Sequence, residues 1–251
     1  MTTTETPAGI GSRGSFFLGV LAALTLATTV VLGLSLPLST EQGPYSRMIA
    51  IHPPIATTEY VAYAVTVLAS ALYLWPRTRQ RRWDLLAGAS AEVGAVFTAL
   101  TLATGSIWGR PTWGVWWVWD ARLTSTAILF FLVLGYLALR RVPMELSRRS
   151  TISAVAALIL VPAVVVDHYA VTWWRTLHQG ASLAQLSPGK SLDGAFIAAM
   201  LVGFVAMGLV YAWLTLHRFR LAVLEERADI EGLDIALEER RAEGLELAAR
   251  P

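Results

Sequence analysis

A tryptophan-rich segment is the feature of this sequence that most clearly predicts a binding function. Five of the ten tryptophans fall within residues 108–119: Trp108, Trp113, Trp116, Trp117 and Trp119. One or two tryptophans would be explained by the preference of this side chain for the membrane interface. If residues 113–120 form a short helix that lies in the interface, three of these tryptophans and Asp120 share one side of it. Such a surface favours a large, flat, apolar ligand.

Arginine side chains near this segment indicate the charge of the ligand. Arg110 and Arg122 stand towards its two ends, and Arg175 lies further along the chain. Guanidinium groups bind carboxylates in a fork-like geometry. A flat apolar ligand with two anionic arms therefore matches the residue types, and haem is a ligand of this kind.

The four histidines are the residues on which a metal site would depend, because the chain contains no cysteine. Without thiols, a thiolate metal site, a disulfide framework and thiol–disulfide exchange are excluded. Neutral imidazole is a common axial ligand of haem iron, and His52 and His178 are the expected pair. His168 is a competing ligand, because Asp167 beside it can orient an imidazole. His217 lies among arginines and is interpreted as an interface residue.

The composition predicts an all-α membrane protein, a bundle of six transmembrane helices. Apolar residues make up 55% of the 251 residues and charged residues 15%, with a mean hydropathy of +0.54. Soluble proteins carry about 25% charged residues to cover their surface. Six apolar stretches approach the roughly 20 residues that cross a bilayer as a helix. They lie near residues 15–36, 48–75, 84–105, 123–140, 151–168 and 193–216.

The chain divides by composition into two parts. Residues 1–216 are expected to form the membrane domain, and residues 217–251 a charged helical tail. The first apolar run, residues 16–36, is longer than a signal-peptide core and is expected to remain as a span. The fifth span is the weakest, because it contains Pro162, although neighbouring helices can satisfy the carbonyl that a proline frees.

Basic residues predict the orientation of the spans. Clusters follow the second, fourth and sixth spans: Arg77, Arg79, Arg81, Arg82, Arg140, Arg141, Arg148, Arg149, Arg218 and Arg220. By the positive-inside rule these connections and both termini are cytoplasmic. Residues 37–52, 105–122 and 168–192 then face outward. The tryptophan-rich segment and the pair His52 and His178 are therefore expected on one face of the membrane.

Two carboxylates fall inside the apolar stretches, Glu59 in the second and Glu92 in the third. Charged groups are costly in lipid and usually face the bundle interior or a cavity. Structural hydrogen bonding is the simplest role for both. Ion coupling in a secondary transporter is an alternative, although such proteins are commonly built from repeats and no internal repeat is evident.

The tryptophan-rich segment also resembles a known family. Residues 108–125, Trp-Gly-Arg-Pro-Thr-Trp-Gly-Val-Trp-Trp-Val-Trp-Asp-Ala-Arg-Leu-Thr-Ser, look like the signature of the cytochrome c maturation protein C (CcmC) family. That family belongs to the haem-handling proteins named for their WWD motif. The similarity extends to residues 91–97 and 173–180, and it covers about residues 15–216. It does not include the charged tail.

The resemblance implies a bacterial inner-membrane protein that binds haem b on its outer face and delivers it to the haem chaperone CcmE during c-type cytochrome biogenesis. It implies that His52 and His178 are axial ligands and that the five tryptophans stack on the ring. Supporting or propionate-binding roles fall to Asp120, Arg122, Arg110, Arg175 and Glu92. The implied partners are the ABC transporter subunits CcmA and CcmB and the small protein CcmD. No enzymatic activity is implied.

Two other functions are compatible with parts of the sequence. A haem lyase of the same WWD family would attach haem to apocytochrome c directly, but its Trp-Asp pair is typically followed by proline. Here Asp120 is followed by Ala-Arg-Leu-Thr-Ser125, and the chain lacks a large extra domain. A structural subunit that only uses its tryptophans as anchors is the second alternative, and copurification of haem would distinguish it.

Overall fold

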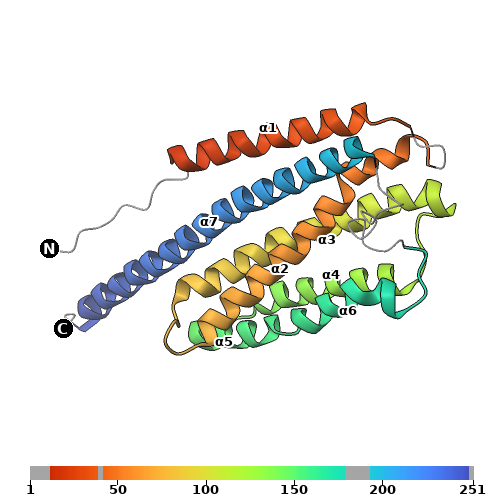
Figure 1. Cartoon of the computed structure of the whole chain (residues 1–251). Coiled ribbons are helices and arrows are strands. Elements are labelled where there is room, and N and C mark those ends of the chain that lie inside the picture. Colours follow the sequence, from red (N-terminus) through yellow and green to blue (C-terminus); the bar gives the residue numbers. More distant parts are fainter. Residues whose placement is uncertain (1–11, 39–41, 179–192, 249–251) are drawn as a thin grey trace.

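The protein is a bundle of long helices, seen in a computed structural model that describes residues 12–38, 42–178 and 193–248 (Figure 1). No strand occurs in these ranges. The elements are α1 (Arg13–Ser35), the 3-10 helix η1 (Pro44–Ala50), α2 (His52–Leu74), α3 (Arg81–Trp113), α4 (Ala121–Leu139), α5 (Leu146–Ala157), α6 (Leu160–Trp173) and α7 (Gly194–Ala248). The predicted all-α class is confirmed.

Six helical segments are long and apolar enough to cross a membrane. They are Arg13–Ser35, Pro44–Leu74, Arg81–Trp113, Ala121–Leu139, Leu146–Trp173 and Gly194–Ala242. The prediction of six spans is therefore confirmed. Because a helix rises about 1.5 Å per residue, the longer of these helices extend beyond the roughly 30 Å hydrocarbon layer.

The fifth span consists of two helices, because a break separates α5 from α6. Residues 158–159 form a turn, and the amide of Val161 bonds to the carbonyl of Leu158. Pro162 has no amide hydrogen to offer that carbonyl, and its ring would clash with it in a straight helix. The proline predicted to weaken this span thus follows the break between α5 and α6.

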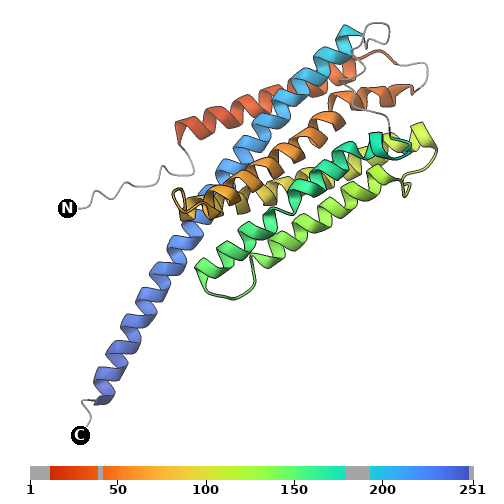
Figure 2. The ribbon, with the colours of Figure 1, turned by 60° about the horizontal axis from the view of Figure 1, so that its bottom comes forward.

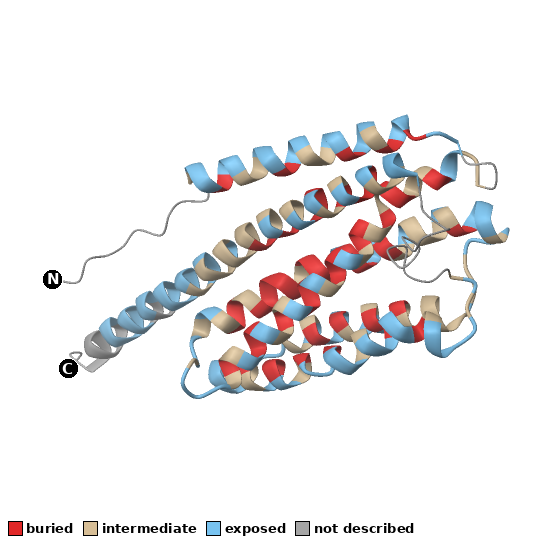
Figure 3. Cartoon of the chain, in the orientation of Figure 1, coloured by how far each residue is buried: buried red, intermediate tan, exposed pale blue. Residues whose placement is uncertain are grey.

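Helices α2 and α3 form the centre of the bundle, where about half of the buried residues lie (Figure 3). Small residues allow this close packing. A Cβ atom on Gly94 of α3 would lie 2.8 Å from the ring of Tyr63 and 3.0 Å from Ala62, both on α2. Membrane helices are commonly packed through small residues, because apolar side chains gain little from leaving lipid.

Helix α1 packs against α7 by a narrow stripe and exposes its other sides. Its buried residues are Ser15, Ala22, Thr29 and Gly33. Gly19 adds to the contact, because a Cβ atom there would lie 2.7 Å from the indole nitrogen of Trp213 on α7. The exposed sides carry large apolar residues such as Phe17 and Leu24, as expected for a helix in lipid.

Helix α7 continues without a break from the sixth span into the charged tail. It extends well beyond the other helices, and Figure 2 shows its end projecting away from the bundle. The helical character expected for the tail is therefore observed to Ala248. The division at residue 216 remains a prediction from composition, since no bend or turn marks it.

Candidate functional site

The three segments predicted to face outward meet at one end of the bundle. The start of α2, the end of α3 and the residues that follow α6 lie together on the right of Figure 1, where α4 also begins. These are the segments that the distribution of basic residues places on a common face. The candidate site is built from their side chains.

The tryptophan-rich segment does not form the short helix expected over residues 113–120. Trp113 is the last residue of α3, and Gly114 ends that helix in the left-handed conformation, with φ +80° and its amide bonded to Arg110. Residues 114–120 are not helical. Valine and tryptophan are weak helix formers, and glycine favours this C-terminal position. The shared face predicted for Trp113, Trp116 and Trp117 is therefore wrong.

His52 is fixed at the start of α2 by a threonine of α3. Its Nδ1 lies 2.9 Å from Oγ1 of Thr104. The Thr104 hydroxyl donates its own hydrogen to the carbonyl of Leu100 at 2.7 Å, so in a neutral ring Nδ1 must be the donor. Nε2 then carries the free lone pair. Gly105 makes room for this ring, because a Cβ atom there would lie 3.2 Å from Cε1 of His52.

The structure brings the two predicted histidines together with two of the tryptophans. The ring centres of His52 and His178 are 6.4 Å apart, with an angle of 48° between the ring planes. Trp113 lies 6.2 Å from His178, and Trp108 makes an edge contact with His52 at 5.7 Å. The Trp108 indole donates to the side-chain oxygen of Gln42 at 3.1 Å, which fixes its orientation. These residues form an aromatic cluster around two imidazoles.

Asp120 connects the tryptophan-rich segment to the residues that carry His178. One carboxylate oxygen caps α4 by accepting from the amide of Leu123 at 2.9 Å. The other accepts from the amide of Leu177, also at 2.9 Å. The residue directly before His178 is thereby held against the start of α4. Because Leu177 lies outside α4, this second bond gives the carboxylate a positioning role in addition to capping the helix.

The remaining tryptophans lie further out. Trp116 and Trp119 are 59% and 79% exposed. Trp117 contacts Trp119 with ring centres 5.4 Å apart, and its buried indole nitrogen has no hydrogen-bond partner among the described residues. The ring contacts of the two histidines thus involve Trp108 and Trp113, whereas this outer group presents aromatic surface to lipid, water or a ligand.

Arg122 lies in a buried polar network beside the site. Its guanidinium donates to the backbone carbonyl of Asp167 at 2.6 Å and lies 3.8 Å from the carboxylate. That carboxylate also accepts from Tyr60 at 2.5 Å, Ser125 at 2.6 Å and Thr126 at 2.9 Å. The sequence indicates Asp167 only as a neighbour of His168. In the fold it joins α2, α4 and α6.

Two other predicted arginines remain at the surface of this end. Arg110 donates to the carbonyl of Gly114 at 2.5 Å, which closes the turn after α3. Arg175 is exposed in the segment that leads to His178. Both side chains are accessible to an anionic group near the aromatic cluster.

The structure does not bring the two intramembrane glutamates to the site. Glu92 pairs with Arg218 of α7 through both carboxylate oxygens. Glu92 lies more than three helical turns before Thr104, which contacts His52. Glu59 is fully buried, and neither of its oxygens meets hydrogen-bond geometry with a described residue. The side chains of Thr98 and Thr101 interact with it.

The other two histidines have aromatic neighbours of their own. His168 is exposed and lies 5.9 Å from the ring of Tyr60 and 4.9 Å from that of Tyr169. His217 lies 4.7 Å from Trp213 of α7. Neither makes a ring contact with the aromatic cluster among the described residues.

The donor set of the site limits which metal it could hold. Within the described ranges, no group of three or more His, Asp or Glu side chains could bind a metal ion. A bare ion such as Zn²⁺ takes at least three protein ligands. Two imidazoles surrounded by tryptophan suit a metal whose other ligands belong to a flat macrocycle.

Comparison with known proteins identifies the family. The family model described as "Heme exporter protein C" matches residues 4–233. A protein of that name from Haemophilus influenzae is 36% identical over 228 residues, which cover 89% of this chain and 90% of the relative. The relative from Bradyrhizobium diazoefficiens is 38% identical over 83% of this chain and 80% of its own length.

A third relative named haem exporter protein C, from Escherichia coli K12, is 38% identical over 75% of this chain and 74% of its own length. The family match includes the first five spans, most of the sixth helical segment and all residues of the aromatic cluster. This chain belongs to the haem exporter protein C (CcmC) family.

Proposed function

We propose that this protein binds haem b between His52 and His178 on the periplasmic face of the bacterial inner membrane and delivers it to the haem chaperone CcmE for c-type cytochrome biogenesis. The single observation that carries this proposal is the meeting of these two histidines inside an aromatic cluster. Family membership supports a role in haem handling, because the relatives are named haem exporters.

The spacing of the two imidazoles supports axial ligation. A metal–imidazole bond is about 2 Å long and the ring centre lies roughly 1 Å further on, so two imidazoles on one iron have centres about 6 Å apart. The separation between His52 and His178 is 6.4 Å. Because Thr104 holds Nδ1 of His52, the free Nε2 is the atom that would bind iron.

The surrounding residues fit the rest of the haem. Trp108 and Trp113 would cover the macrocycle next to the imidazoles. Arg110 and Arg175 are the exposed cations that could pair with propionates, whereas Arg122 already has Asp167 as its partner. Trp116, Trp117 and Trp119 would extend the apolar surface outward.

Delivery requires that haem can leave, and the site has a suitable construction. His52 is 8% exposed and is the first residue of α2, where Thr104 holds its ring. His178 instead follows α6 in a non-helical segment, which the Leu177–Asp120 bond ties to the bundle. Release of one ligand by movement of a short segment costs less than unpacking a helix. His52 would therefore retain haem, and movement of His178 would allow its release.

The membrane orientation and the partners belong to the same proposal. The arginine clusters lie at the end of the bundle opposite the aromatic cluster, which by the positive-inside rule makes that end and both termini cytoplasmic. The aromatic cluster then faces the periplasm, where the chaperone acts. We infer association with the ABC transporter subunits CcmA and CcmB and with CcmD in one haem export complex.

The proposal is tested by purifying the full chain with its partner subunits and adding haem-free CcmE. We expect a low-spin haem spectrum in the complex and a loss of that absorbance as haem appears on the chaperone. A complex that contains no more haem than an unrelated six-span protein from the same membranes would contradict haem binding. Bound haem that never moves to the chaperone would contradict delivery.

Replacing Asp120 by alanine should lower haem affinity about 10- to 100-fold, the usual cost of losing a residue that orients a metal ligand. The reason is that Leu177 loses its acceptor and His178 is no longer held in place. Haem titration measures the affinity, and part of the spectrum should become high-spin because one axial ligand is misplaced.

Asp193→Ala is the matched control for this substitution. Asp193 also accepts from an amide at a helix start, that of Ala195 on α7 at 3.1 Å. Both variants lose a helix cap worth about 0.5–2 kcal/mol. Of these two carboxylates, only Asp120 accepts a hydrogen bond, among the described residues, from the segment that carries His178. Equal haem affinity and spin state in the two variants would show that Asp120 acts as a cap alone.

A further inference from the structure

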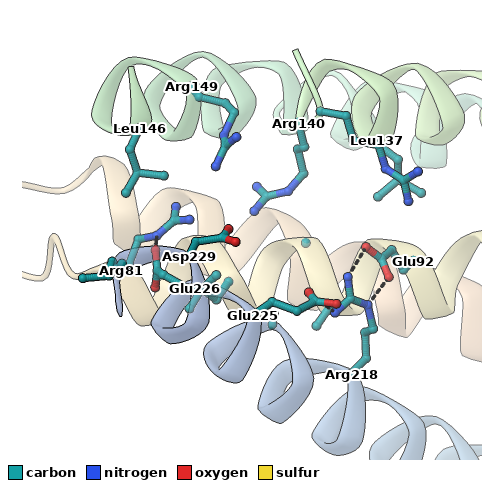
Figure 4. Close-up of a pocket in the computed structure, with 16 residues that line it drawn as sticks. Arg81, Glu92, Leu137, Arg140, Leu146, Arg149, Arg218, Glu225, Glu226 and Asp229 are labelled. Atoms are coloured by element: carbon teal, nitrogen blue, oxygen red, sulfur yellow. Dashed lines mark hydrogen bonds and ion pairs between the residues drawn. The ribbon is translucent and has the colours of Figure 1, made fainter. Parts of the chain in front are cut away.

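A pocket of about 400 Å³ with nine charged side chains in its lining lies among α3, α4, α5 and α7 (Figure 4). It is at the end of the bundle opposite the aromatic cluster. Its walls come from the first turns of α3, the α4–α5 connection and the part of α7 that leaves the bundle. Helix α3 runs from Arg81 at this pocket to Trp113 at the site, so the two regions are separate.

Most of the charges around the pocket are already paired. Arg140 donates to both carboxylate oxygens of Asp84, at 2.7 and 3.0 Å, and Arg81 also pairs with that residue. On the opposite wall Arg218 of α7 pairs with Glu92 and, at 3.2 Å, with Glu225. These contacts fix α7 and α4 to α3, and they leave the paired groups with little charge to offer a ligand.

Three charged side chains that line the pocket have no such partner. Arg141 and Arg149, on the α4–α5 side, make no side-chain hydrogen bond or ion pair with any described residue, and neither does Asp229 on α7. Figure 4 shows Arg149 pointing across the pocket towards the side where Asp229 stands. One wall therefore presents free guanidinium groups and the other a free carboxylate.

The pocket lies where the apolar spans end. Helix α4 ends at Leu139, and α5 begins at Leu146. Leu85, Leu137 and Leu146 line the pocket beside the charged groups. A polar pocket between helices at this depth meets the headgroups of the bilayer rather than its hydrocarbon.

We propose that this pocket binds the headgroup of a phospholipid that carries both a phosphate and a primary ammonium group, as phosphatidylethanolamine does. Arg141 and Arg149 would bind the phosphate, and Asp229 would accept hydrogen bonds from the ammonium group. The lining contains five arginines and four carboxylates. Asp84, which pairs with Arg81 and Arg140 from behind the lining, supplies a fifth carboxylate, so the positive and negative charges are equal in number. A balanced pocket with separated free charges favours a zwitterion over an anionic lipid.

The choice among phospholipids follows from the hydrogen bonds and charges that Asp229 can use. A primary ammonium group has three N–H donors for the Asp229 carboxylate, whereas the trimethylated group of phosphatidylcholine has none. Phosphatidylglycerol has the phosphate but no cation to meet Asp229. Lipid selectivity, and not only lipid binding, is therefore the property that identifies this site.

The test is native mass spectrometry of the full chain from mixed micelles with equal amounts of phosphatidylethanolamine, phosphatidylcholine and phosphatidylglycerol. The wild-type protein should retain phosphatidylethanolamine in preference to the other two. Arg141→Gln/Arg149→Gln should reduce its retention about 25-fold, because each basic residue near a headgroup contributes a factor of about five. Asp229→Asn should remove the preference over phosphatidylglycerol.

Two neighbouring residues supply the controls. Arg148 is exposed on α5 and Glu231 on α7, and neither lines the pocket. Arg148→Gln and Glu231→Gln should behave as the wild type. The proposal fails if Arg148→Gln lowers retention as strongly as the double substitution, because general surface charge would then explain binding. It also fails if the wild type shows no preference, or if Asp229→Asn leaves the preference unchanged.

Discussion

Replacing His52 and His178 together by alanine is expected to reduce the haem that copurifies with the protein by more than tenfold. Loss of a residue that only orients a ligand lowers metal affinity about 10- to 100-fold, and loss of the ligands themselves must cost more. Either single variant should retain some haem with a changed spectrum, because one imidazole and both Trp108 and Trp113 remain. The measurement is haem per protein together with the absorption spectrum.

The matched control is His168→Ala, which removes an exposed histidine outside the aromatic cluster. It should keep the wild-type haem content. A chemical rescue separates ligation from folding: free imidazole should restore the low-spin spectrum of His178→Gly, whose ligand lies on a non-helical segment. A wild-type spectrum in the double variant would refute axial ligation by this pair, whatever the haem content.

The membrane architecture could be predicted from the sequence because it depends on averages over long segments. About 20 apolar residues define a span regardless of which side chain contacts which. The same averaging explains why the break at Pro162 was only partly predictable. The proline marks the position, but whether the span bends or separates into α5 and α6 depends on the helices around it.

The convergence of His52, His178 and Trp108 followed from topology, since alternate connections of a six-span bundle lie on one side. The topology could not predict the local backbone conformation of the tryptophan-rich segment. The helical periodicity expected for residues 113–120 fails because α3 continues to Trp113 and a left-handed Gly114 then ends it. A glycine within a tryptophan-rich run is a signal for a helix end that outweighs the spacing of the aromatic residues.

The residues that orient the site were the hardest to predict. Thr104 precedes Trp108 by one helical turn, so it faces the same way, but a threonine in an apolar helix has no distinctive pattern. The second bond of Asp120 joins positions far apart in the sequence, and only the fold shows that Leu177 is its donor. Hydrogen bonds between distant residues leave no periodicity to detect.

Asp167 is the residue whose replacement should destabilise the fold most. It is completely buried and accepts hydrogen bonds from Tyr60, Ser125 and Thr126, while its carboxylate faces Arg122. Asp167→Ala would leave a buried guanidinium without its counter-charge, which costs about 3–5 kcal/mol. At about 2–4 °C per kcal/mol for a chain of this size, the melting temperature should fall by roughly 6–20 °C.

Two further variants show whether charge or hydrogen bonding causes this loss. Asp167→Asn keeps one carbonyl oxygen as an acceptor but removes the charge, so it should fall between the wild type and Asp167→Ala. Glu145→Ala removes an exposed carboxylate that caps α5 through Ser147 and Arg148, and it should cost only about 0.5–2 kcal/mol. The melting temperatures of the detergent-solubilised variants, measured by tryptophan fluorescence, give their order of stability.

The same network connects stability to the site. Arg122 lies two residues after Asp120, and α6 leads from Asp167 into the segment that carries His178. If the network positions both Asp120 and the segment that carries His178, Asp167→Asn should weaken haem binding. This effect should appear even well below the melting temperature, where the protein is fully folded. Unchanged haem affinity in a folded Asp167→Asn protein would confine Asp167 to stability. A melting temperature for Asp167→Ala close to that of the wild type would contradict the buried ion pair itself.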